Sequence, residues 1–106
     1  MKLAIIGSGY VGLVSGACLS DFGHDVTCID KDNNKISALK RGIIPIYEPG
    51  LESLVLKNIK SRRLSFTTNI KTAVKDCDVV FIAVGTPANE NGGGADLNSV
   101  LRLLAT

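Results

Sequence analysis

The sequence lacks the features that would place this chain in a membrane or on a nucleic acid. No apolar run approaches the roughly 20 residues that a membrane-spanning helix needs. The start, MKLAIIGSG, has no small-residue cleavage site of the kind that ends a secretory leader. The net charge is only +2, and the densest basic cluster, 57–63, falls at the end of a predicted helix. We therefore expect a cytoplasmic protein that binds neither membranes nor nucleic acids.

Cysteine and histidine are also scarce. The chain has three cysteines, Cys18, Cys28 and Cys77, and one histidine, and it has no CxxC pair. This pattern does not fit the ligand spacing of metal sites or of redox pairs. We predict no metal site and reduced, mostly buried thiols, with Cys18 on the apolar face of a helix and Cys28 inside a strand.

What the chain does have is an alternation of strands and helices, without internal repeats or a linker. Its 106 residues, 45% of them hydrophobic, suffice for one domain with a packed core. In the first helix, Val11, Val14, Cys18 and Phe22 recur at helical spacing and predict the apolar face. Strands are predicted at 2–6, 25–30, 64–67 and 79–84, and helices after Gly9, at 33–40, 51–59, 69–75 and after Asp96. The alternation predicts an α/β fold, a doubly wound parallel sheet in the order 3-2-1-4 with helices on both faces.

Three glycines follow the first predicted strand in the stretch GSGYVG, which matches the pattern G-x-G-x-x-G. In that pattern the first glycine, Gly7, makes the turn. The second, Gly9, lets a pyrophosphate approach the backbone, and the third, Gly12, lets helix and strand pack closely. The N–H groups and dipole at the start of the helix favour an anion there. The strand before and the helix after the glycines predict a Rossmann-type dinucleotide-binding domain.

An acidic residue at the end of the second predicted strand indicates which dinucleotide binds. Asp30 follows Gly12 by 18 residues, close to the expected spacing of about 20. A carboxylate there can accept hydrogen bonds from both hydroxyls of an adenosine ribose, and it would repel a 2′-phosphate. The sequence therefore favours NAD over NADP as the cofactor, although the cation of Lys31 beside Asp30 acts in the opposite direction.

Several longer stretches carry a resemblance to one family. GSGYVGL, CIDKDNNKI, PIYEPGL, VFIAVGTP and ADLNSV follow one another along the chain, and in this order they resemble the N-terminal part of the UDP-glucose 6-dehydrogenases. YEPGL and VGTP are the most specific of these stretches beside the Tyr10-Val11-Gly12 ending of the glycine loop. The wider family also includes GDP-mannose and UDP-N-acetylmannosamine dehydrogenases, and no N-terminal residue separates these substrates cleanly.

The resemblance implies an enzyme that oxidises the C6 alcohol of a nucleotide sugar, with UDP-glucose as the first choice, to a carboxylate. Two NAD would be consumed through an intermediate linked to a cysteine in a later domain, for polysaccharide precursor synthesis. It implies contacts to the cofactor from the Val11 backbone, Lys35 and Thr86, with Tyr10 and YEPGL on the sugar-nucleotide side. The cofactor-binding residues expected in total are Gly7, Gly9, Tyr10, Val11, Gly12, Asp30, Lys35, Val84, Gly85, Thr86 and Pro87; none is expected to be catalytic.

Other interpretations stay open. Lys35 is also what a solvated helix would carry, Thr86 could cap a strand end, and Glu48 before Pro49 is also a common helix start. A module that senses NAD or NADH, another dehydrogenase with this fold, or a purely structural domain would share the glycine loop. The helical pattern after Asp96 runs on to Thr106, so we expect residues 1–106 to form half of a larger NAD-binding domain. We expect its parent to be a homo-oligomer, and the chain alone to be inactive.

Overall fold

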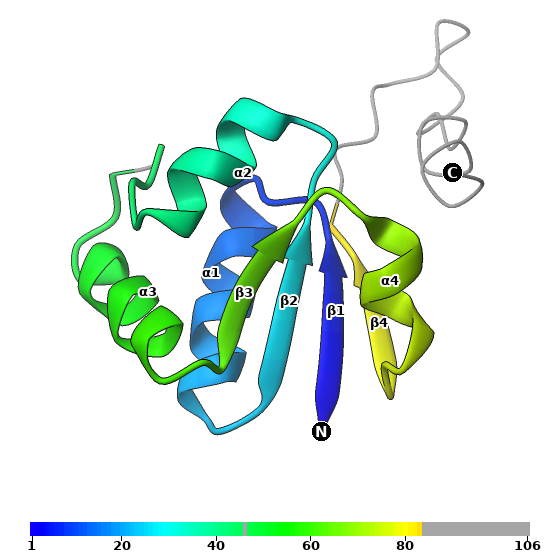
Figure 1. Ribbon diagram of the computed structural model, residues 1–106. Helices are drawn as coiled ribbons and strands as arrows, with labels where there is room; N and C mark the ends of the chain where they lie inside the picture. The colour runs from blue at the N-terminus through cyan, green and yellow to red at the C-terminus, as the bar shows by residue number, and fades with distance from the viewer. Residues whose placement is uncertain (46, 84–106) are drawn as a thin grey trace, which may run out of the picture.

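The chain folds into a four-stranded parallel sheet with helices on both faces in a computed structural model, which describes residues 1–45 and 47–83 (Figure 1). The strand order is β3-β2-β1-β4, so the predicted order 3-2-1-4 is confirmed. The strands are β1 (Lys2–Ile6), β2 (Asp25–Ile29), β3 (Leu64–Thr67) and β4 (Val79–Ile82), and the helices are α1 (Tyr10–Asp21), α2 (Asn33–Lys40), α3 (Leu51–Lys60) and α4 (Ile70–Lys75).

Most elements begin and end where the sequence pattern places them. Strand β2 ends at Ile29 rather than at Asp30, so that Asp30 stands just beyond the sheet. Strand β4 ends at Ile82, two residues before the predicted end, and the helix predicted after Asp96 lies outside the described residues. The Asp32 carboxylate caps α2 as predicted, accepting hydrogen bonds from the backbone nitrogens of Asn34 and Lys35. The ends of β1 and β2, which lie beside the candidate site, therefore fall within one residue of their predicted positions.

The sheet separates two apolar layers. Leu3 and Ile5 of β1 contribute to the larger layer, which α1, α2 and α3 cover. Ala4 and Ile6 point the other way, into a smaller layer beneath α4. Figure 1 shows α1 behind the sheet and α4 in front of it. Successive residues of β1 thus pack into opposite apolar layers, which is why the strand is a continuous apolar run in the sequence.

The prediction of which face of α1 is buried is wrong. Val11 and Phe22 are 64% and 82% exposed, Cys18 is exposed and Val14 is half-buried. The helix instead buries a neighbouring face that is made largely of small residues: Gly12, Leu13, Gly16, Ala17 and Ser20. Small residues let the helix lie close to the strands, so that close packing, rather than the size of the apolar side chains, decides which face is buried.

Two glycines of α1 set this close approach. A Cβ built on Gly12 would overlap the carbonyl oxygen of Gly7, and one built on Gly16 would lie 2.7 Å from the sulfur of Cys28.

All three cysteines are free: Cys28 is buried, Cys77 is half-buried and Cys18 is exposed. The prediction of mostly buried thiols is therefore wrong for Cys18, because Cys18 lies on the face of α1 whose burial was predicted wrongly.

Candidate functional site

The glycine loop joins β1 to α1 at the carboxyl end of the sheet, and each of its glycines meets a different structural requirement. Gly7 has φ of 104°, a conformation that side-chain-bearing residues rarely adopt. Gly12 has no room for a Cβ, because the Gly7 carbonyl oxygen lies against it. Gly9 differs from both, since its φ of −73° is ordinary and a Cβ there would meet nothing within 4 Å. No contact within the described protein requires a glycine at position 9, so the open space beside it suits a ligand.

The space beside Gly9 lies at the start of α1, where backbone N–H groups lack helical partners. Gly9 is the N-cap residue, no side chain caps the helix, and its first turn carries no acidic residue. The positive end of the helix dipole is therefore available for an anion. These observations fit the pyrophosphate of a dinucleotide.

Asp30 stands beside the glycine loop and is held in one orientation. Its Oδ2 accepts hydrogen bonds from the backbone nitrogen of Ser8 at 3.2 Å, from the Ser8 hydroxyl at 2.9 Å and from Lys35 Nζ at 3.2 Å. Its Oδ1 accepts from the backbone nitrogen of Asp32 at 3.1 Å. The Asp30 side chain is 20% exposed, so the carboxylate is partly open to a ligand.

The charge state of Asp30 follows from two opposing effects. Burial raises the pKa of the Asp30 carboxyl, but the hydrogen bonds from the Asp32 amide, from Ser8 and from Lys35 outweigh it. The resulting pKa lies below the usual value for aspartate. Asp30 is therefore a carboxylate at neutral pH, able to accept hydrogen bonds from hydroxyl groups and to repel a phosphate.

A second contact joins the glycine loop to the YEPGL segment. The Tyr10 hydroxyl donates a hydrogen bond of 3.0 Å to Oε2 of Glu48, and this bond and the Glu48 charge raise the pKa of the Tyr10 hydroxyl. Tyr10 is 53% exposed and Tyr47 is 93% exposed, so this contact lies on the surface. The predicted grouping of Tyr10 with YEPGL is consistent with this bond.

The structure brings together most of the candidate residues that it describes. Gly7, Gly9 and Gly12 form the loop, and Lys35 and Asp30 meet beside it. Tyr10 and Val11 open α1, both with exposed side chains. Val84, Gly85, Thr86 and Pro87 lie outside the described residues. The sequence analysis missed Ser8, whose only signal was its place between two glycines of the loop.

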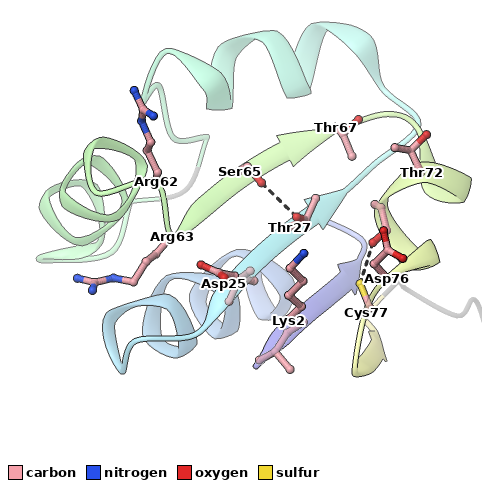
Figure 2. A pocket seen from close by; sticks show the side chains of 13 residues that line it. Lys2, Asp25, Thr27, Arg62, Arg63, Ser65, Thr67, Thr72, Asp76 and Cys77 are labelled. Atoms are coloured by element: carbon pink, nitrogen blue, oxygen red, sulfur yellow. Dashed lines mark hydrogen bonds between the residues drawn. The ribbon is translucent and has the colours of Figure 1, made fainter.

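A different hollow, of about 500 Å³, lies against α4 and the polar face of β2 and β3. Figure 2 shows the Thr27 and Ser65 hydroxyls paired across the two strands, with Lys2 beside them and Arg62 and Arg63 extending away. Neither the glycine loop nor Asp30 lines it. This hollow and the candidate cofactor site are therefore separate parts of the surface.

The described residues show neither a metal-ligand cluster nor a membrane-spanning helix. In the ranges 1–45 and 47–83, no three His, Cys, Asp or Glu side chains gather closely enough to hold a metal ion. No helix among those residues is both long and apolar enough to cross a membrane.

The parallel sheet, the glycine loop and the acid at the end of β2 together define a Rossmann-type dinucleotide-binding domain. The whole chain, residues 1–106, matches the model of the UDP-glucose/GDP-mannose dehydrogenase family, NAD binding domain. The chain belongs to this family, and NAD is the cofactor of the domain.

The chain is similar to part of several longer proteins. It is 64% identical over 100 residues to a UDP-glucose 6-dehydrogenase of Rhizobium meliloti, covering 94% of this chain and 23% of that protein. It resembles the structure of GDP-mannose dehydrogenase from Pseudomonas aeruginosa, with a TM-score of 0.89 and 46% identity over 97% of this chain and 23% of that one. A UDP-N-acetyl-mannosamine dehydrogenase from Staphylococcus aureus has a TM-score of 0.88 at 33% identity over 99% of this chain and 25% of that one. The chain thus spans about a quarter of the length of these relatives.

Proposed function

We propose that this chain is the NAD-binding part of a UDP-glucose 6-dehydrogenase that oxidises UDP-glucose to UDP-glucuronate for polysaccharide precursor synthesis. The observation that carries the proposal is the 64% identity to a UDP-glucose 6-dehydrogenase over almost the whole chain. Converting a primary alcohol to a carboxylate removes four electrons. Each NAD accepts two of them as a hydride, so the full reaction consumes two NAD.

We propose a role for several of the chain's own residues. Asp30 accepts hydrogen bonds from the adenosine ribose, because its carboxylate is ionised and partly exposed. The backbone at Gly9 and Val11 faces the pyrophosphate, in the space that no side chain fills. Lys35 lies on the adenosine side through its contact with Asp30. Tyr10 and Glu48, which share a hydrogen bond, are proposed to face the sugar nucleotide, as the resemblance implies.

The remaining parts of the proposal concern the longer protein. Val84, Gly85, Thr86 and Pro87 are proposed to contact NAD after β4. We propose that residues 1–106 form an incomplete NAD-binding domain of a longer protein; the chain spans about a quarter of the relatives' length. As the resemblance implies, we propose that the cysteine nucleophile belongs to a later domain and that Cys18, Cys28 and Cys77 do not carry the oxidation. Cys28 is buried, and burial raises its pKa to about 12.

We place the parent protein in the cytoplasm, as a homo-oligomer with a nucleotide sugar as its small-molecule partner. Cys18, Cys28 and Cys77 are all free thiols, which suits a reducing compartment. A net charge of only +2 does not favour binding to nucleic acids.

The experiment is an NADH absorbance assay on the complete protein with UDP-glucose, GDP-mannose and UDP-N-acetylmannosamine in parallel. We expect UDP-glucose to give the highest kcat/KM and two NADH per molecule oxidised. The 106-residue chain alone should bind NAD in calorimetry and reduce none. A clear preference for GDP-mannose or UDP-N-acetylmannosamine would show that the proposed substrate, UDP-glucose, is wrong. NAD binding by the complete protein without any turnover would favour a module that senses NAD.

A further inference from the structure

Ser8 is fully buried although it lies in a loop that faces a ligand. It occupies the variable position between Gly7 and Gly9 and has no exposed surface. Both of its hydrogen-bond donors reach the same atom, since the backbone nitrogen and the hydroxyl bond Oδ2 of Asp30 at 3.2 and 2.9 Å. A buried hydroxyl aimed at a carboxylate is a charge-assisted contact of the stronger kind. It ties the glycine loop to the acid at the end of β2.

The two oxygens of Asp30 are occupied unequally. Oδ2 accepts from Ser8 twice and from Lys35 Nζ. Among the described residues, Oδ1 accepts from the Asp32 amide alone. A carboxylate oxygen can accept about two hydrogen bonds, so Oδ2 is saturated and Oδ1 keeps a lone pair for a further donor.

We propose that Ser8 is a positioning residue for cofactor selection, holding Oδ2 of Asp30 so that Oδ1 remains directed to a ribose hydroxyl of NAD. The inference rests on the proposed ribose role of Asp30. Without the Ser8 hydroxyl, Lys35 is the only side chain in the described part of the chain that holds this carboxylate. Asp30 is then free to rotate about its existing contact with the Lys35 ammonium, so Oδ1 leaves the direction of the ribose. The Lys35 cation stays in place and still offsets the charge that repels a 2′-phosphate.

The charge state of Asp30 gives this role a signature separate from cofactor binding. The hydrogen bonds from Ser8 contribute to the lowered pKa of the Asp30 carboxyl. Lys35 on α2 is the charged side chain that contacts it, and the neighbouring Asp32 contributes only its backbone amide. Removing the hydroxyl should therefore raise the Asp30 pKa even when no cofactor is present.

Ser20 offers a matched control. It is also fully buried, and its hydroxyl donates 2.9 Å to the Ala17 carbonyl oxygen within α1. Ser20→Ala removes a buried hydroxyl of the same kind away from Asp30. Ser8→Cys keeps a side chain of similar size but replaces the hydroxyl by a weak donor, while Ser8→Thr keeps a hydroxyl.

The experiment measures the dissociation constants for NAD and NADP by calorimetry on the complete protein, and the Asp30 pKa by NMR titration of its carboxyl carbon without cofactor. For Ser8→Ala and Ser8→Cys we expect NAD binding weakened about three- to tenfold, the range of one ordinary hydrogen bond. The preference for NAD over NADP should fall and the Asp30 pKa should rise. Ser8→Thr should restore both, and Ser20→Ala should change neither.

Asp30→Ala separates failure of this inference from failure of the proposed function. If Asp30→Ala leaves the preference for NAD unchanged, the ribose role itself is wrong. If Asp30→Ala abolishes the preference while Ser8→Ala and Ser8→Cys keep both it and the Asp30 pKa, the Ser8 inference alone is overturned. Because Ser8→Cys leaves no cavity at the buried position, a Ser8→Ala protein that fails to fold still leaves a variant that decides the outcome.

Discussion

Substitutions of Gly9 and Gly12 should have opposite effects, although the two glycines belong to the same motif. Gly9→Val should abolish NAD binding and leave the fold intact. Gly12→Ala should destabilise the fold itself. The contrast arises because a ligand needs the space at Gly9, whereas the protein already fills the space at Gly12.

Gly9→Val is expected to change the free energy of unfolding only slightly. Its φ of −73° and ψ of −164° are accessible to valine, and no heavy atom lies within 4 Å of the new Cβ. Valine is a poor N-cap, which costs about 1 kcal/mol and lowers the Tm by about 4–8 °C. In the complex, the branched side chain would occupy the place of the pyrophosphate oxygens.

Gly12→Ala has no such freedom. The new Cβ would overlap the carbonyl oxygen of Gly7, lie 3.0 Å from its carbonyl carbon and 3.4 Å from Cγ2 of Ile5. Two of these atoms are backbone, so α1 must move away from β1. Overpacking of this kind costs about 1–3 kcal/mol or more, and each kcal/mol lowers the Tm by about 4–8 °C.

Thermal unfolding followed by circular dichroism measures the stability of each variant, and titration calorimetry with NAD measures binding. We expect a folded Gly9→Val protein that releases no heat with NAD, and a Gly12→Ala protein with a clearly lower Tm. Wild-type affinity in Gly9→Val would show that the glycine loop is an ordinary turn. An unchanged Tm in Gly12→Ala would refute the close packing of α1 on β1.

Three further predictions use the same assays or simple variants of them. Calorimetry should show tighter binding of NAD than of NADP, and Asp30→Ala should weaken NAD by about 1.5–3 kcal/mol; equal affinities of the parent protein would count against the ribose role. Because the pKa of Asp30 is lowered in the folded state, its stabilising effect should be complete above the unfolded pKa of about 3.9 and decline as the pH falls toward the folded pKa. Urea unfolding of the parent and of Asp30→Asn should therefore differ at pH 7 and converge at low pH, whereas a constant difference would contradict this linkage. A thiol reagent followed by mass spectrometry should label the exposed Cys18 first and leave Cys28, with its pKa raised to about 12 by burial, unmodified in the folded state; early labelling of Cys28 would mean that α1 opens readily.

The sheet order and the glycine loop were predictable because each has a strong local signal. The strands are short apolar runs at regular intervals, and the glycine spacing is tied to one geometry. The right-handed crossover rule then leaves few topologies. Asp30 was found for the same reason, since its position is fixed by the end of β2.

The face of α1 and the role of Ser8 were not predictable from these signals. Helical spacing favoured the larger side chains of Val11 and Phe22, but the sheet lies closest to the glycines, and those residues remain exposed. Ser8 occupies a position that the motif leaves free, and its contact with Asp30 spans 22 residues of sequence. Contacts of this kind depend on tertiary packing, which periodicity does not report.

The contact between α1 and β2 has a consequence for how this sequence can vary. A Cβ at position 16 and the sulfur at position 28 would lie 2.7 Å apart, so the two residues share one volume. An alanine at 16 requires the Cys28 sulfur to move or to be replaced by a smaller group, and a larger residue at 28 favours glycine at 16. The two positions should therefore exchange in pairs, and a redesign that treats them as independent would separate the first helix from its sheet.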